Sequence, residues 1–161
     1  MELFEAISKR RSVRSFTGDD IPRQDLEKIV DAGRLACTGR NLQPWDFIIV
    51  TKKETIAYFA QQTEWVSDAA AVIAIVSNPS SRWWLEDSAA AAENILLATT
   101  ALGYGGCWLE GVTLEREADY KVLLSIHSHK RLFTIIPIGV PTEIPPKDKK
   151  PLDQVLHWEK Y

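Results

Sequence analysis

Apolar residues recur along the first half of the chain with two different periods, which predict alternating helices and strands. Residues 3–9 and 22–35 place apolar side chains three and four positions apart, as amphipathic helices do. Pro22 suits the first turn of the second helix. Runs rich in β-branched residues at 47–50 and 70–77 predict strands. The second run is apolar throughout, so we expect a buried strand that is covered on both faces.

The second half contains the most strongly helical stretch and two further candidate strands. Residues 89–102 are nearly all Ala, Leu, Ile and Thr, so we expect a buried helix, either central or pressed into a dimer interface. Gly103 follows as its left-handed cap. Residues 107–112 predict a third strand and residues 131–140 a fourth, with Pro137 at an edge or a bulge. Shorter helices are expected at 53–62 and 114–125.

Composition limits the chain to one ordinary domain, residues 1–161, with 45% apolar and 25% charged residues. The formal net charge of −3 disfavours nucleic-acid binding or anchoring to an anionic membrane. The apolar runs are too short to span a bilayer and no signal peptide is visible, so we expect a cytoplasmic protein. Cys37 and Cys107 lack the spacing of a metal or redox pair, and we expect free thiols.

The C-terminal segment, residues 141–161, differs from the rest of the chain. It is rich in Pro and Lys and then becomes apolar at Leu152, Val155, Leu156 and Trp158. An extended segment that turns apolar cannot cover much of its own domain. We therefore expect it to wrap a partner subunit.

A basic cluster near the N-terminus is the first candidate site. Arg10, Arg11 and Arg14 stand beside Ser12, at the end of the first predicted helix. Rigid guanidinium groups suit bidentate binding of phosphate or carboxylate. The alternative is a solvated helix end whose positive charge complements the helix dipole.

Other chemistry is weakly indicated. Thr38, Asn41 and Gln43 lie in a polar loop before a predicted strand, which fits either ligand binding or an Asx-type turn. The glycines at 103–106 follow a helix, the opposite order to a dinucleotide-binding fingerprint. The three histidines lack the partners of a hydrolytic or metal site and are expected at the surface.

Four segments together resemble the FMN-dependent nitroreductase family. They are residues 10–16, 41–47, 103–111 and 147–152, in the family's order and covering essentially the whole chain. The resemblance implies an α+β fold with a central mixed β-sheet flanked by helices. It also implies a domain-swapped homodimer that holds FMN at its interface, with residues 141–161 wrapping the partner subunit.

The resemblance also implies roles for individual residues. Arg10 and Arg14 would hold the FMN phosphate and ribityl chain, helped by Ser12 and by Lys147 or Lys149. Arg11 is a further candidate.

Two other segments would contact the flavin ring. The loop with Thr38, Gly39, Asn41 and Gln43 would reach the flavin from the second subunit. Leu109, Glu110 and Gly111 would lie along the ring near N5, mainly through backbone groups. Glu110 is the acidic residue expected near the reactive edge, the alternative being an exposed carboxylate at a strand end.

The implied activity is hydride transfer from NAD(P)H through flavin N5 to a nitroaromatic, quinone or related small molecule, by a ping-pong mechanism. No nucleophilic residue and no metal is needed. The alternatives are an FMN-binding or sensing protein without turnover, an interaction protein that binds phosphorylated partners, and a dehalogenating or flavin-fragmenting relative.

Overall fold

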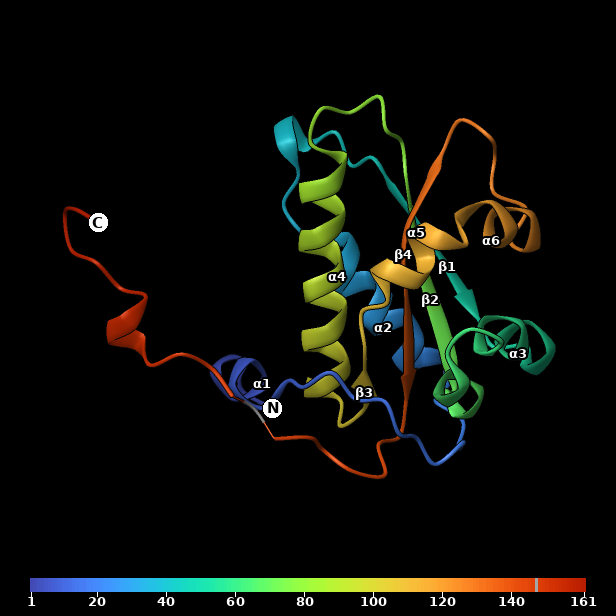
Figure 1. Cartoon of the computed structure of the whole chain (residues 1–161), viewed down its shortest axis with the longest axis horizontal. Coiled ribbons are helices and arrows are strands. Elements are labelled where there is room, and N and C mark those ends of the chain that lie inside the picture. The colour runs from blue at the N-terminus through green and yellow to red at the C-terminus, as the bar shows by residue number, and fades with distance from the viewer. Residues whose placement is uncertain (147) are drawn as a thin grey trace.

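A four-stranded sheet separates two layers of helices in the computed structural model, which describes residues 1–146 and 148–161 (Figure 1). The helices are α1 (Leu3–Lys9), α2 (Arg23–Arg34), α3 (Lys53–Ala60), α4 (Trp84–Ala101), α5 (Glu110–Glu115) and α6 (Glu117–Leu123). The strands are β1 (Trp45–Val50), β2 (Ala71–Ser77), β3 (Gly105–Gly106) and β4 (Arg131–Gly139), in the spatial order β1-β2-β4-β3. Helices α2 and α4 cover one face, and α3, α5 and α6 cover the other.

Strand β2 is buried along its whole length, as its unbroken apolar run predicts. Its odd-numbered positions, such as Ile73 and Ile75, pack into the core beneath α2 and α4. Its even-numbered positions, such as Val72 and Val76, pack into the core beneath α3 and α6. Successive strand residues point to opposite faces, so a strand covered on both sides must be apolar at every position.

The predicted third strand at 107–112 is wrong. Strand β3 consists only of Gly105 and Gly106, and helix α5 begins at Glu110. Leu109 still bonds to the sheet, where its N–H donates to the Ile135 carbonyl at 3.0 Å. The chain then leaves the sheet edge and coils into α5.

Within residues 1–146 and 148–161, a single parallel contact makes the sheet mixed. All pairs among the four strands are antiparallel, and the parallel element is a single bridge between Ser12 and Gly106. Pro137 does not lie at a sheet edge or at the observed bulge, which falls at Ile75 and Val76. Its carbonyl accepts the Cys107 N–H at 3.2 Å, so its ring nitrogen faces the side of the short strand β3, where few ladder bonds are lost.

Helices α2 and α4 cross at a glycine. A Cβ on Gly33 would lie 2.8 Å from Ile95 Cγ1, so only glycine allows this close approach. The buried face of α2 consists of Leu26, Ile29 and Gly33, whereas Leu35 lies past the helix end and is exposed. Helix α4 begins at Trp84, earlier than the sequence pattern indicates.

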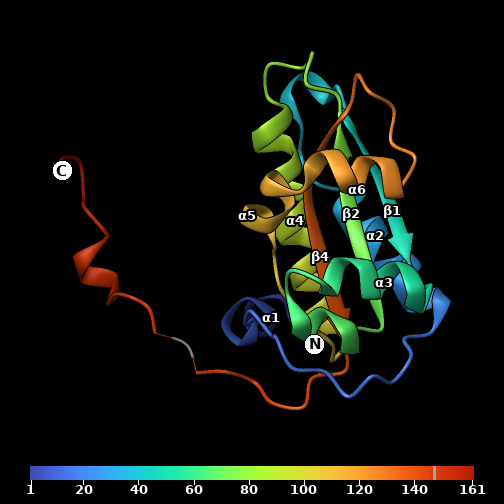
Figure 2. The same ribbon diagram turned by 45° about the vertical axis from the view of Figure 1, so that its right-hand side comes forward.

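The C-terminal segment first runs beside the N-terminal loop, where the Thr142 N–H donates to the Ser15 carbonyl at 3.1 Å, and its last part, residues 152–161, extends away from the rest of the protein (Figures 1 and 2). Its Trp158 side chain is 80% exposed, and Phe4 on helix α1 is 83% exposed. Lys147, one of the two candidate tail lysines, lies outside the described residues. Among the described residues, no helix is both long and apolar enough to cross a bilayer.

Candidate functional site

The basic cluster is fixed to the sheet edge immediately after α1. Val13 is buried, and its N–H donates to the Gly106 carbonyl at 3.0 Å. A Cβ on Gly105 would lie 2.8 Å from three side-chain atoms of Val13, so glycine is required for this contact. Ser12 and Arg14, the neighbours of Val13, are thereby held at the edge of β3. The first and third segments of the family resemblance lie side by side.

A pocket of about 220 Å³ forms at this cluster. Its lining residues come from both ends of the chain: Arg10, Arg11, Ser12, Arg14, Pro145, Pro146, Asp148 and Lys149. Four of these side chains are cationic and one is a carboxylate, so the lining carries a clear positive excess. The structure therefore brings together the predicted phosphate-binding residues, apart from Lys147.

The guanidinium groups are oriented mainly by backbone carbonyls. Arg11 Nη1 donates to the carbonyls of Ser8 and Arg10 at 2.8 and 2.9 Å, and Arg11 Nε is buried with no partner among the described residues. Arg10 Nε contacts Glu93 Oε1 at 3.2 Å, which leaves its terminal nitrogens for other contacts. Backbone carbonyls orient an arginine without cancelling its charge, so the cluster remains able to attract an anion.

Cys107 lies beneath the cluster and is 1% exposed. Burial raises the pKa of its thiol, and this effect outweighs the Arg14 charge, a Ser12 hydrogen bond and the Arg10 charge, which all lower the pKa. The thiol is therefore protonated at neutral pH, and a protonated thiol is a poor nucleophile. Cys37, the other free cysteine, is exposed.

Leu109, Glu110 and Gly111 form the start of α5 rather than a strand end. Leu109 remains bonded to β4, Glu110 is half-buried in the first helical turn, and Gly111 is exposed. The reading of Glu110 as a strand-end carboxylate is thus wrong. Its chain position, a few residues after Cys107, keeps this segment next to the sheet edge that carries the basic cluster.

The polar loop at 38–43 lies elsewhere. It packs against the start of α4, at the opposite end of the molecule from β3 and the basic cluster (Figure 1). The Gly39 N–H donates to Asp87 Oδ1 at 2.9 Å, and Gln43 N–H donates to Thr38 Oγ1 at 3.3 Å. One chain alone does not unite this loop with the basic pocket.

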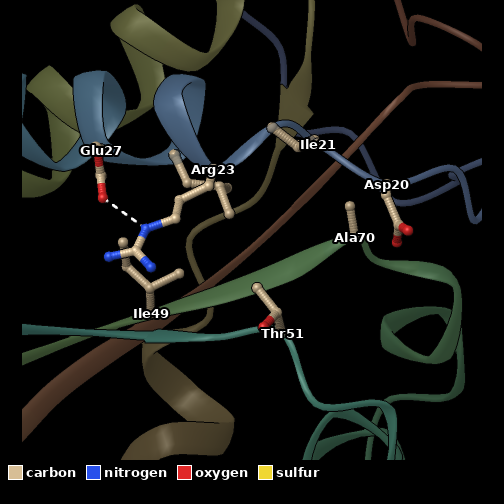
Figure 3. A pocket seen from close by; sticks show the side chains of 8 residues that line it. Asp20, Ile21, Arg23, Glu27, Ile49, Thr51 and Ala70 are labelled. Carbon is tan, nitrogen blue, oxygen red and sulfur yellow. Dashed lines mark hydrogen bonds and ion pairs between the residues drawn. The ribbon is translucent and has the colours of Figure 1, made fainter.

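A second cavity, of about 570 Å³, opens between the start of α2 and strands β1 and β2 (Figure 3). Its charged lining consists of Asp20, Glu27 and Arg23, and Arg23 Nε is paired with Glu27 Oε1 at 2.8 Å. With two carboxylates against one guanidinium, this cavity is unsuited to a phosphate. Although it has the greater volume, the chemistry favours the pocket at the basic cluster.

His127 and His129 stack with their ring centroids 5.6 Å apart. No group of three or more His, Cys, Asp or Glu side chains suited to a metal ion occurs in the part of the chain that the structure describes. The stacked pair therefore gives no support to a metal centre.

Two polar residues of α4 belong to these sites and were not predicted. Glu93 contacts Arg10, and Asp87 holds Gly39. Glu93 interrupts the apolar helical run at 89–102, whereas Asp87 precedes that run and lies in the first turn of α4. Their partners lie far away in the sequence, so these sequence signals do not say what either residue contacts.

The nitroreductase family model matches residues 7–70 and 61–140. The chain belongs to the nitroreductase family. A candidate NADH dehydrogenase/NAD(P)H nitroreductase of Archaeoglobus fulgidus is 34% identical over 153 residues, which are 88% of this chain and 87% of the relative. The protein of Methanothermobacter thermautotrophicus with the same name is 32% identical over 153 residues, covering 90% and 80% of the two chains.

Solved structures support the same family and fold. The NADPH:FMN oxidoreductase of Vibrio harveyi, determined with NAD⁺, superposes with a TM-score of 0.85 at 26% identity, covering 99% of this chain and 77% of that one. An FMN-dependent nitroreductase of Clostridium difficile gives 0.87 at 25% identity, covering 98% and 99%. A further relative was found by sequence similarity. It is the iodotyrosine deiodinase of Thermotoga neapolitana, which is 25% identical over 96% of this chain and 95% of its own. The predicted family and nitroreductase-like fold are confirmed.

Proposed function

We propose that this protein is an FMN-dependent oxidoreductase that takes a hydride from NAD(P)H and reduces a small organic acceptor. The observation that carries the proposal is the pocket in which Arg10, Arg11 and Arg14 converge with Lys149. Membership of the nitroreductase family and the FMN-dependent relative among the solved structures support the same cofactor.

The residues present fit the phosphate of FMN. Arg11 Nε is buried with no partner among the described residues, and such a donor calls for an acceptor. The positive excess of the lining suits a phosphate, which carries nearly two negative charges at neutral pH. Asp148 opposes this attraction, but a single carboxylate does not cancel four cations.

The protein's contribution is binding, orientation and electrostatics. Arg10 and Arg14 would bind the phosphate, Ser12 would donate a hydrogen bond, and Lys149 would close the pocket from the tail. Leu109, Glu110 and Gly111 would lie along the ring near N5. FMN itself, when bound, supplies the ability to accept and pass on a hydride. Cys107 is a neutral thiol and plays no nucleophilic part in this mechanism.

A homodimer would complete the site. Residues 1–161 form one FMN-binding domain in this proposal, and the 38–43 loop with Thr38, Gly39, Asn41 and Gln43 reaches the flavin of the partner subunit. Two features support this arrangement: apolar side chains such as Phe4 and Trp158 are exposed, and the tail leaves its own domain. Helix α1 and the tail each carry several exposed apolar side chains, such as Leu3 and Phe4 on α1 and Leu152 and Trp158 on the tail, and a concentration of such side chains is typical of subunit interfaces.

The test begins with the absorption spectrum of purified protein reconstituted with FMN, followed by anaerobic addition of NADH and then NADPH. Bound flavin that bleaches supports the proposal. Bound flavin that stays oxidised with both nucleotides would indicate an FMN-storing or sensing protein. Failure to bind FMN would leave a protein that binds some other phosphorylated partner.

The double variant Arg10→Ala with Arg14→Ala tests the assignment of the phosphate site. Each lost charge-assisted hydrogen bond costs about 1.5–3 kcal/mol, so the loss of two should lower FMN affinity at least about a hundredfold. Arg34→Ala is the matched control, because Arg34 forms an exposed ion pair with Asp31 on α2. A double variant that retains wild-type affinity would refute the assignment.

A dehalogenase is the second candidate function, because a deiodinase relative aligns over nearly the whole chain. A panel of acceptors containing a nitroaromatic, a quinone and iodotyrosine distinguishes the two, with iodide release as the specific readout. Rapid iodide release with slow nitro reduction would favour the dehalogenase.

A further inference from the structure

Asp87 is a buried carboxylate with an incomplete set of partners. Its side chain lies in the first turn of α4 and is only 4% exposed. Oδ1 accepts the Gly39 N–H at 2.9 Å, while Oδ2 is buried with no partner among the described residues. Burying a carboxylate is costly, and the helix dipole offsets only part of that cost. A carboxylate kept under such conditions calls for an explanation beyond core packing.

The loop that Asp87 holds is strained. Arg40, Asn41 and Gln43 have φ values of 53°, 56° and 48°. The left-handed region disfavours side chains with a Cβ, and strained backbone persists only where its surroundings hold it in place. Within the loop, backbone bonds close one turn, from the Asn41 N–H to the Thr38 carbonyl at 3.0 Å and from the Leu42 N–H to the Gly39 carbonyl at 3.1 Å. The contacts of Gln43 with the Asn41 carbonyl and with Thr38 Oγ1 are longer, both at 3.3 Å. These local bonds shape the turn, and contacts from outside attach it to the rest of the protein.

The start of α4 and Trp83, the residue that precedes it, supply those contacts to Gly39. A Cβ on Gly39 would lie 2.3 Å from Trp83 Cε3, so the glycine backbone is packed directly against the indole. The Arg40 guanidinium lies 5.6 Å from the centre of the same ring. Trp83 blocks movement towards the helix, and the Asp87 carboxylate ties the Gly39 N–H in place.

We infer that Asp87 is a positioning residue that sets the conformation in which the 38–43 loop presents Thr38, Asn41 and Gln43 to the flavin of the partner subunit. This inference rests on the proposed function, because the target of the loop is FMN. Asp87 acts through Gly39 and does not itself touch the cofactor.

The first test needs no cofactor. Arg40 is a trypsin site within the loop, so its cleavage rate reports how firmly the loop is held. Asp87→Ala should accelerate cleavage after Arg40 about tenfold or more, whereas Asp87→Asn, which keeps an acceptor oxygen for Gly39, should stay within about threefold of wild type. Equal cleavage rates for wild type and Asp87→Ala would show that Asp87 does not hold the loop, whether or not the protein binds FMN.

The second test uses the FMN-loaded protein. Asp87→Ala should lower kcat/KM for NAD(P)H about tenfold and change the flavin absorption bands, with Asp87→Asn restoring both. Asn94→Ala is the matched control, because Asn94 on the same helix also bonds a backbone group, the Ala32 carbonyl at 3.0 Å, but lies away from the loop. It should leave the kinetics and the spectrum unchanged.

The outcomes separate the inference from the proposed function. Absence of FMN binding by the wild-type protein would contradict the proposed function and the proposal that the loop contacts FMN. The cleavage assay would still show whether Asp87 holds the loop. If the wild type binds FMN but Asp87→Ala shows unchanged kcat/KM, or if Asp87→Asn and Asn94→Ala are impaired as much as Asp87→Ala, the positioning role is wrong.

Discussion

Gly105→Ala should damage both the stability of the protein and its affinity for FMN. The new Cβ would lie 2.8 Å from Cβ, Cγ1 and Cγ2 of Val13, a side chain that is 2% exposed and cannot rotate away. Val13 must therefore move, and its hydrogen bond to the Gly106 carbonyl will stretch. Because Ser12 and Arg14 flank Val13, the basic cluster would move with it.

The magnitude follows from the packing. Inserting a methyl group into a closely packed contact typically costs about 1–3 kcal/mol. For a chain of this size each kcal/mol lowers Tm by roughly 2–4 °C, so we expect a decrease of roughly 2–12 °C. Displacement of one phosphate-binding arginine should also weaken FMN binding about tenfold. Thermal unfolding of the apo protein and titration of flavin fluorescence measure the two effects separately.

Gly103→Ala is the matched control. Gly103 lies two residues away with φ of +89°, and a Cβ there would meet nothing within 4 Å. This variant should lose about 1 kcal/mol through backbone strain but keep its affinity for FMN. Wild-type affinity in Gly105→Ala, or an equal loss of affinity in both variants, would show that the contact with Val13 does not position the basic cluster.

Three further predictions follow from the charged groups and the tail. Glu93→Gln should tighten FMN binding about two- to fivefold in fluorescence titrations. Glutamine can still accept a hydrogen bond from Arg10 Nε, but the substitution removes a negative charge near the pocket. The gain in affinity should therefore shrink at high salt. Burial raises the pKa of the Glu117 carboxyl. Hydrogen bonds from Arg131 and from the Leu132 N–H lower that pKa by more than burial raises it, so the net pKa is below its ordinary value. That stabilisation is present above the unfolded pKa of about 4.3 and is lost as the pH falls through the folded pKa. Glu117→Gln should therefore cost about 1 kcal/mol in urea unfolding at pH 7, a value reduced for screening because Arg131 is 43% exposed, and little once the pH is below the folded pKa. Deleting residues 152–161 should convert a dimer into a monomer in light scattering, and a variant that remains dimeric would contradict the wrapping role of the tail.

The spacing of apolar residues predicted most of the helices and central strands, because this spacing reflects which side of each element is buried. Residues 3–9 match α1, and the apolar run at 70–77 matches β2 nearly residue for residue. The strand predicted at 107–112 is wrong because only its first residues bond to β4, through the N–H groups of Cys107 and Leu109, before the chain coils into α5 at Glu110. The apolar composition of this segment suits a short helix packed on the sheet as well as it suits a strand, so composition alone does not distinguish the two.

The candidate site divides in the same way. Arg10, Arg11 and Arg14 are near neighbours in the sequence, so the sequence itself shows their shared chemistry. The partner of Asp87 lies 48 positions away along the chain, and no local pattern connects the two. Glu93 likewise reads only as a break in an apolar helix until the fold places it against Arg10.

Helix α4 links the two halves of the proposed site. Asp87 and Glu93 are six residues apart, which corresponds to about 9 Å along the axis and about 240° of rotation. The two side chains therefore point away from α4 in very different directions. Asp87 points towards the 38–43 loop, and Glu93 points towards Arg10. In the proposed homodimer the loop serves the partner's FMN and Arg10 serves its own. Each α4 would then orient residues in both cofactor sites, so a displacement of this single helix would reach both flavins.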